Sequence, residues 1–244
     1  MNYRQFSPHP ALAPYIDAYW TATGDDCGMK TEKILPDGCI DIIFNLGAEC
    51  QTESNTCLLK NNQPYLIGTM TRFKETTMLP ETELLGIRFK PAAFTVFYEY
   101  PALYKLTDRT VEFDKKLSPD IENAAKYSTA YLDHFFLKKL SQPKRSLLPL
   151  ISDIKNCDGQ LSVQALAQKH FTTVRQLERA FNRDMGIGPK EFINLVRYQS
   201  TFQKIRNNAS RKSLLEIAFE SGYYDHSHLT NELKKYTGAA PTQF

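Results

Sequence analysis

Two stretches in the C-terminal half of this 244-residue chain carry side chains that can hydrogen-bond to the edges of DNA bases. Arginine pairs with guanine, asparagine with adenine, and serine or threonine with several bases. Cations beside them would contact phosphates, and such contacts dominate the affinity for DNA. The first stretch offers Arg175, Glu178, Arg179 and Asn182, and the second offers His226, Ser227, Thr230, Asn231, Lys234 and Lys235.

Several of these residues also have a plainer interpretation. The arginines and lysines could be solvated surface charges. Glu178 could accept a hydrogen bond from cytosine or pair with the neighbouring Arg175. His226 and His228 are two residues apart and do not share a helical face, which argues against a metal site. We expect His228 to pack near the core.

The elements that must position these side chains are helices with one apolar face. In the first stretch the inward stripe is spaced by three or four residues and consists of Val174, Leu177, Phe181 and Met185. A shorter helix capped by Ser162 precedes it, and a turn at 171–173 joins the two. In the second stretch Ser213 begins the short helix and Asp225 caps the next, whose inward residues are Leu229, Leu233 and Tyr236.

The two stretches are copies of one another. The segment 186–192 matches 238–244 at Gly, Pro and Phe, an offset of 52 residues, and the apolar positions upstream follow in order. We interpret residues 162–185 and 213–237 as two helix-turn-helix units. A long helix from Pro189 to about Arg206 would connect them. Such a helix could hold the two recognition helices about one DNA turn, roughly 34 Å, apart.

The charge is distributed unevenly along the chain. The net charge is +3 overall, but residues 1–143 carry 15 basic and 18 acidic side chains, whereas residues 144–244 carry 15 and 9. A change of sign between halves predicts two domains with different partners. No apolar run is long enough to span a membrane, and we see no secretory signal in the first ten residues. The five cysteines form no CxxC pair. Together these features predict a cytoplasmic protein.

The N-terminal half reads as short strands followed by a helix. Apolar residues alternate along 40–46 and 85–89, and shorter strands are expected at 65–67 and 76–79, which predicts a sandwich or barrel. Pro91 would start a short helix, and Ser118 would cap a helical connector over 118–140. The break at 141–144 places the boundary so that one domain covers 1–142 and the other 143–244.

A few polar and aromatic residues of this half are ambiguous. Trp20, Tyr15 and Tyr19 could line a ligand pocket, although core packing is the more common role for such residues. Asp41 and Arg88 lie opposite the apolar faces of their strands. They could grip a polar effector, although a surface or cross-strand pair is favoured.

Residues from about 145 to 244 resemble the DNA-binding domain of the AraC/XylS family of bacterial transcription regulators. The resemblance rests on Leu166-Ala167, on 176–181 (QLERAF), on 186–189 (GIGP), on 215–218 (LEIA), on 222–229 (GYYDHSHL), and on 236–238 with Pro241. It implies a domain of seven helices that binds specific promoter sites. By position, the base contacts would be Arg175, Glu178 and Arg179 in the first unit and His226, Ser227, Thr230 and Asn231 in the second. The phosphate contacts would be Asn182, Lys234 and Lys235.

One departure affects the second unit, because Asn231 stands where relatives commonly have arginine. In the N-terminal half, 14–16, 19–20, 35–41, 44–47 and 86–91 resemble the β-rich domain attached to some members of the family. Such domains sense small molecules or dimerise.

The sequence therefore predicts a multidomain α+β protein: a cupin-like sandwich or barrel followed by an all-α tandem helix-turn-helix domain. Its expected function is sequence-specific transcription regulation, modulated by a small molecule or by dimerisation through the 118–140 helix. Double-stranded DNA is the expected partner, and RNA polymerase and a second copy of the chain are further candidates. The alternative is a cupin-like metal enzyme fused to a DNA-binding domain. That enzyme would need two or three histidines at the metal, and the first 133 residues contain only His9. No cofactor is expected.

Overall fold

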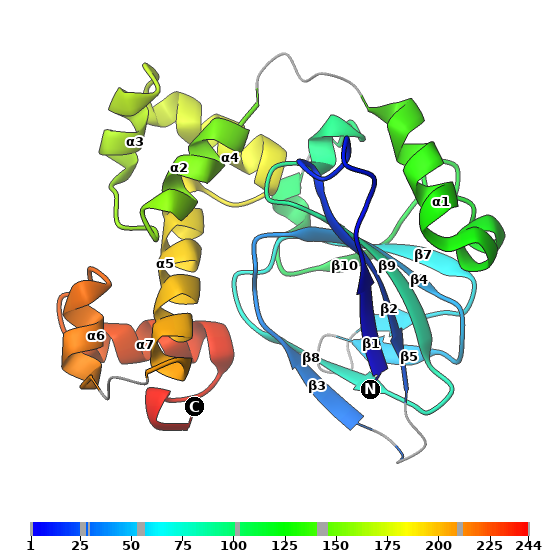
Figure 1. Cartoon of the computed structure of the whole chain (residues 1–244), viewed down its shortest axis with the longest axis horizontal. Coiled ribbons are helices and arrows are strands. Elements are labelled where there is room, and N and C mark those ends of the chain that lie inside the picture. Colours follow the sequence, from blue (N-terminus) through cyan, green and yellow to red (C-terminus); the bar gives the residue numbers. More distant parts are fainter. Residues whose placement is uncertain are drawn as a thin grey trace.

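A computed structural model describes residues 2–24, 28, 30–52, 57–100, 103–140, 146–208 and 212–243. The N-terminal domain consists of two antiparallel sheets with helices on one side, and the C-terminal domain is helical (Figure 1). This arrangement confirms the predicted α+β fold with a β-sandwich and a helical domain. The predicted boundary at 142–143 lies outside the described residues.

The larger sheet has six strands in the order β1-β2-β9-β4-β7-β10, and the smaller has four in the order β3-β8-β5-β6. The six are β1 (Asn2–Phe6), β2 (Ile16–Thr23), β9 (Glu83–Phe89), β4 (Ile40–Asn45), β7 (Gln63–Ile67) and β10 (Thr110–Glu112). The four are β3 (Lys30–Ile34), β8 (Lys74–Met78), β5 (Cys50–Thr52) and β6 (Cys57–Leu59).

The central strand β4 explains how the two sheets are held together. Its alternation places Ile42 opposite Ile87 and Phe44 opposite Leu85 of β9, and these side chains join one apolar core. All six residues of β4 are buried, because the opposite face, which carries Asp41 and Ile43, points toward the second sheet. Both faces of β4 therefore belong to the interior.

Helices cover the outer face of the six-stranded sheet. They are the 3-10 helices η1 (Phe94–Val96) and η2 (Leu103–Leu106) and the long helix α1 (Ile121–Lys139). Leu132 and Phe136 of α1 pack into the same core as β4. A short helix was predicted to start at Pro91. Only the single 3-10 turn η1 forms there.

The predicted cap of α1 was wrong by two residues. Asp120 is the N-cap, and its Oδ1 accepts a hydrogen bond from the Asn123 amide at 2.9 Å. The Ser118 hydroxyl instead donates to the carbonyl groups of Lys115 and Pro119. Asp and Ser are equally good caps, so the choice between them depends on the loop that precedes the helix.

The C-terminal domain contains six α-helices and a closing 3-10 helix among its described residues. They are α2 (Leu148–Asn156), α3 (Val163–Lys169), α4 (Val174–Met185), α5 (Pro189–Arg206), α6 (Leu214–Glu220), α7 (His226–Thr237) and η3 (Pro241–Gln243). The two predicted units correspond in position to α3–α4 and α6–α7. The N-caps of α3, α6 and α7 are made by nearby residues. Ser162, Ser213 and Asp225 each accept a hydrogen bond from the backbone amide three residues later in the chain.

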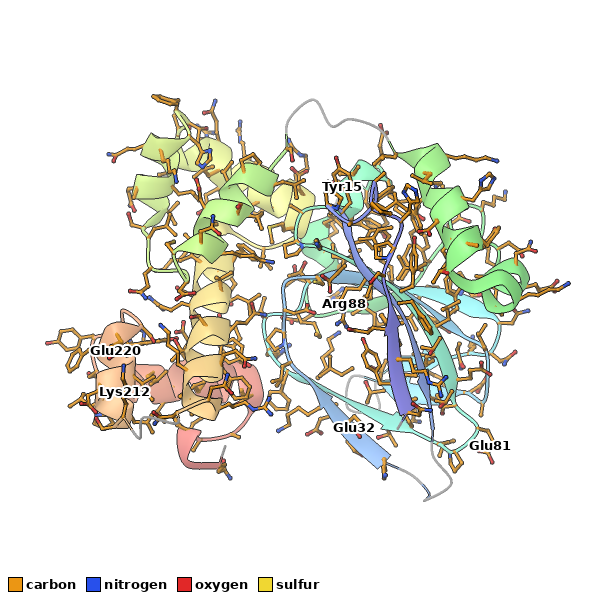
Figure 2. The ribbon with its side chains drawn as sticks, viewed as in Figure 1. Tyr15, Glu32, Glu81, Arg88, Lys212 and Glu220 are labelled. Atoms are coloured by element: carbon orange, nitrogen blue, oxygen red, sulfur yellow. The ribbon has the colours of Figure 1, made fainter. Side chains whose placement is uncertain are left out.

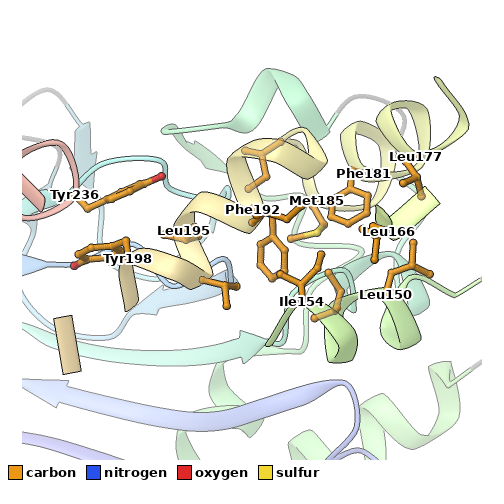
Figure 3. Packing of buried hydrophobic residues seen from close by; sticks show 14 of the residues in the cluster. Leu150, Ile154, Leu166, Leu177, Phe181, Met185, Phe192, Leu195, Tyr198 and Tyr236 are labelled. Atoms are coloured by element: carbon orange, nitrogen blue, oxygen red, sulfur yellow. The ribbon is translucent and has the colours of Figure 1, made fainter. Parts of the chain in front are cut away.

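One apolar core runs through both helix-turn-helix units (Figure 3). Phe192 of α5 contacts the Phe181 ring of α4, with ring centres 6.2 Å apart. Further along α5, Tyr198 stacks on Tyr236 of α7 at 4.5 Å. The long helix α5 therefore anchors both recognition helices to a single rigid element.

Two further features concern the described residues as a group. None of the helices in the described ranges is long and apolar enough to cross a membrane. Cys39, Cys50 and Cys157 are thiols that form no disulfide among the described residues, and Cys27 lies outside them.

Candidate nucleic-acid interface

The helix α4 presents cations on the face opposite its core. Arg175 and Arg179 are exposed, whereas Leu177, Phe181 and Met185 are buried. The predicted inward stripe fails at its first position, because Val174 is 38% exposed. Val174 is the first residue of α4 and lies beyond the reach of the core that covers the next turn.

Glu178 and Asn182 are less exposed than the two arginines. A Cβ atom at Gly188, just before α5, would lie 3.1 Å from Glu178 Oε2, so this carboxylate is turned toward the start of α5. Within the described part of the chain no ion pair joins it to Arg175. The Asn182 side chain donates to the Glu178 carbonyl at 2.8 Å. Glu178 and Asn182 remain predicted contacts to DNA, and each also has an intramolecular neighbour that competes for its side chain.

The helix α7 presents a more neutral face. His226, Ser227, Asn231 and Lys234 are exposed at its surface. The Thr230 hydroxyl donates to the His226 carbonyl at 2.7 Å, which leaves its oxygen to accept a hydrogen bond.

Lys235 and His228 have partners inside the domain. Lys235 forms an ion pair with Glu191 of α5, and its ammonium also lies 4.8 Å from the centre of the Tyr236 ring. His228 is exposed rather than buried, but one edge of its ring packs on buried Tyr223 at 5.3 Å. The prediction that His228 packs near the core is therefore only partly met.

The two recognition helices lie toward opposite ends of α5 (Figure 1). This helix has 18 residues, which corresponds to about 27 Å at 1.5 Å per residue. That length is compatible with recognition helices separated by about one turn of DNA, roughly 34 Å.

The N-terminal domain contacts the C-terminal ends of both recognition helices, which the sequence analysis missed. At the end of α4, the Thr69 hydroxyl donates to the Met185 carbonyl at 2.6 Å and the Thr107 hydroxyl to the Gly186 carbonyl at 2.7 Å. At the end of α7, Lys33 Nζ donates to the Thr237 carbonyl at 3.0 Å.

The same surface continues along α5. Gln199 donates to the Pro36 carbonyl at 3.2 Å. Gly38, with φ +80°, lies so close to Phe192 that a Cβ at this position would be 2.9 Å from the ring. We call these contacts, from Lys33, Pro36, Gly38, Thr69 and Thr107 to α4, α5 and α7, the interdomain interface. The repeated glycines Gly186 and Gly238 follow the last residues of α4 and α7, but no local sequence pattern indicates the partners of these helix ends.

A cavity of about 310 Å³ lies between the two sheets of the N-terminal domain. Arg88 lies near the centre of the domain in Figure 2 and lines this cavity together with Trp20 and Asp41. Asp41 and Arg88 form the predicted cross-strand pair, with Nε and Oδ1 3.3 Å apart, but they face the cavity and not the surface. Tyr15 and Tyr19 pack with the core on the other side of the sheet, as expected.

The buried Asp41 carboxyl should make stability depend on pH. Burial raises its pKa from 3.8 to about 6, although Arg88 opposes the shift. Because the folded state then binds more protons than the unfolded state, the free energy of unfolding should fall as pH rises from about 4 to about 6. The Asp41→Asn variant should lose that part of the pH dependence. Chemical denaturation at a series of pH values measures it, and an unchanged profile in the variant would contradict this origin.

No group of three or more His, Cys, Asp or Glu side chains that could hold a metal ion occurs among the residues that the structure describes.

Comparisons with known proteins give matches for both halves of the chain. Residues 166–244 match the model of a helix-turn-helix domain family, and residues 4–112 match a domain family of unknown function (DUF6597). An uncharacterised HTH-type transcriptional regulator from Haemophilus influenzae is 28% identical over 103 residues. That match covers 42% of this chain and about a third (34%) of the relative's length.

Among solved structures, ToxT from Vibrio cholerae bound to (E)-4-(8-methylnaphthalen-1-yl)but-3-enoic acid aligns over 100% of this chain and 98% of its own. Its TM-score is 0.49 at 11% identity. An AraC-type regulator from Chromobacterium violaceum aligns over 40% of this chain and 86% of its own, with a TM-score of 0.37 and 21% identity.

Proposed function

We propose that this chain, which carries an AraC-type helix-turn-helix domain in residues 166–244, is a transcription regulator that binds specific DNA sites. The observation that carries the proposal is the pair of recognition helices α4 and α7, each with an exposed polar face and each anchored to α5. Two such helices on one rigid element can enter successive major grooves on the same side of DNA.

The exposed faces suggest how the two grooves are read. Arg175 and Arg179 of α4 suit guanine, and Asn231 of α7 suits adenine. His226 and Ser227 lie in the first turn of α7, where they can reach base edges, and Thr230 can accept one hydrogen bond. Lys234 is the stronger candidate for a phosphate contact, because Lys235 must first leave Glu191. Glu178 and Asn182 would have to turn outward to take part.

The interdomain interface suggests how the N-terminal domain modulates binding. It contacts the last carbonyl groups of both recognition helices, so a shift of either contact would change the position of a recognition helix. Lys33 also lines the cavity between the sheets, and so do Asp37 and Met70, which are adjacent to interface residues Pro36 and Thr69. A small molecule in the cavity would therefore reach the interface directly.

Dimerisation through α1 is a second candidate mode of modulation. The apolar residues Ala124, Leu132 and Phe136 of this helix face its own domain core, while Leu137 is 38% exposed. A dimer would have to form on the mainly polar remainder of the helix. RNA polymerase remains a candidate partner of a DNA-bound regulator.

Removing the Lys33 ammonium should loosen the end of α7. We expect Lys33→Met to speed amide hydrogen exchange in the last turn of α7 by roughly five- to tenfold, since a hydrogen bond contributes about 1 kcal/mol. Mass spectrometry of exchanged peptides measures this, with exposed Lys116→Met as the matched control. Equal exchange in the wild-type protein and in Lys33→Met would contradict a role for the interface in solution.

The proposed function is tested by comparing specific with shuffled DNA. A sequence recovered by the full chain from a random pool should bind at least a thousandfold tighter than its shuffled counterpart at physiological salt. Gel-shift titration of both duplexes measures the ratio. Equal affinity for the two would contradict sequence-specific regulation.

A further inference from the structure

The cavity between the sheets is lined by both apolar and charged side chains. Trp20, Ile43, Met78 and Leu84 provide apolar walls from strands of both sheets. Its volume of about 310 Å³ lies at the lower limit for small-molecule sites, which run from about 300 to 1,000 Å³. The cavity therefore suits a compact ligand that buries one apolar group.

Six charged side chains line the cavity: Arg88, Lys74 and Lys33 are positive, and Asp37, Asp41 and Glu32 are negative. Arg88 and Asp41 are paired across β9 and β4, and Lys74 is the first residue of β8 on the facing sheet. The three positive and three negative charges balance. A ligand with a net charge would leave an uncompensated charge in a mostly buried site, which is costly.

Hydrogen bonding among these groups leaves donors of Arg88 and an acceptor of Asp41 to spare. Asp41 Oδ1 accepts from Trp20 Nε1 at 2.8 Å and from Arg88 Nε at 3.3 Å. Arg88 Nη1 lies 3.6 Å from Asp37 Oδ2. In the described part of the chain, Arg88 Nη2 and Asp41 Oδ2 have no hydrogen-bond partner. A positive donor and a negative acceptor thus stand side by side in the cavity.

We propose that this cavity binds a small zwitterion with an apolar side chain, such as an apolar α-amino acid. Its carboxylate would accept from Arg88, its ammonium group would donate to Asp41, and its side chain would pack against Trp20. The net charge of the site stays balanced when such a ligand binds, and both spare hydrogen-bonding groups gain a partner.

The position of Asp37 in the cavity lining gives the ligand a regulatory role. Asp37 lies between Pro36 and Gly38, which contact Gln199 and Phe192 of α5. A head group held beside Asp37 would thus be one residue away from the interdomain interface. This role rests on the proposed function, whereas ligand binding itself does not depend on DNA.

The binding test uses matched ligands that differ only in the head group. Leucine, methionine, phenylalanine and tryptophan are each compared with the corresponding acid that lacks the amino group and the amine that lacks the carboxylate. Calorimetry on the full chain without DNA should show at least one amino acid that binds at least tenfold tighter than both of its counterparts. The proposal is overturned if none of the four binds, or if an acid or amine binds as tightly as its amino acid.

Two variants assign the head groups. Asp41→Asn, which keeps the side-chain shape, should shift the preference from the amino acid toward the acid, and Arg88→Gln should shift it toward the amine. A purely structural role would weaken all three ligands equally, and that result would overturn the assignment. Circular dichroism confirms folding, and Asp41→Asn suffices if Arg88→Gln does not fold. Because the measurement contains no DNA, its failure is separate from failure of the proposed function.

Discussion

Replacing Phe192 by alanine should lower the free energy of unfolding by about 3–5 kcal/mol, since a fully buried ring would leave a cavity. The Phe192 side chain has 0% exposure and contacts the ring of Phe181. It also packs against the backbone of Gly38 in the N-terminal domain. In the wild-type protein the Phe192 ring is enclosed by α4, by α5 and by the interdomain interface. These elements restrict how far the neighbouring side chains can move to fill the cavity in the variant. Chemical denaturation followed by circular dichroism measures the change.

A matched control is available in the same domain. Phe219 of α6 is 60% exposed, so Phe219→Ala should change the free energy of unfolding by less than about 0.5 kcal/mol. Comparable losses for the two variants would show that Phe192 is not part of a shared core.

The Arg179→Ala variant should lose about 1–3 kcal/mol of binding free energy for the specific site, or roughly 5- to 150-fold in affinity. Arg179 is exposed on α4 and, with Arg175, supplies the donors that suit guanine. The variant should also accept any base at one position of the site. Gel shifts with DNA that carries each base at that position measure both effects.

Lys234→Ala serves as the control for a phosphate contact. It should weaken binding to all sequences alike and reduce the slope of log affinity against log salt by about one. If Arg179→Ala and Lys234→Ala behaved identically, the division into base and phosphate contacts would be wrong.

The helical domain could be predicted in detail because its signals are local. Ser162, Ser213 and Asp225 cap their helices where the sequence placed them, and the apolar stripes follow the period of a helix. The exceptions occur where a neighbour decides the outcome. Val174 is exposed because the core ends before it, and Glu178 turns toward α5 because Gly188 has no side chain there.

Features that join distant parts of the chain could not be read from the sequence. Alternation in β4 predicted one apolar face, but it could not show that a second sheet covers Asp41 on the other side. The contact of Lys33 with Thr237 spans 204 residues, and no local pattern marks it. The cavity and the interdomain interface both depend on such long-range contacts, and for that reason they appear only in the structure.

The central claim is that α4 and α7 read two DNA segments at a distance fixed by α5. Sequencing the DNA that the full chain selects from a random pool tests it most directly. We predict two conserved segments with centres about 10–10.5 base pairs apart, one turn of the double helix. A single conserved segment, or two segments at variable spacing, would contradict the claim.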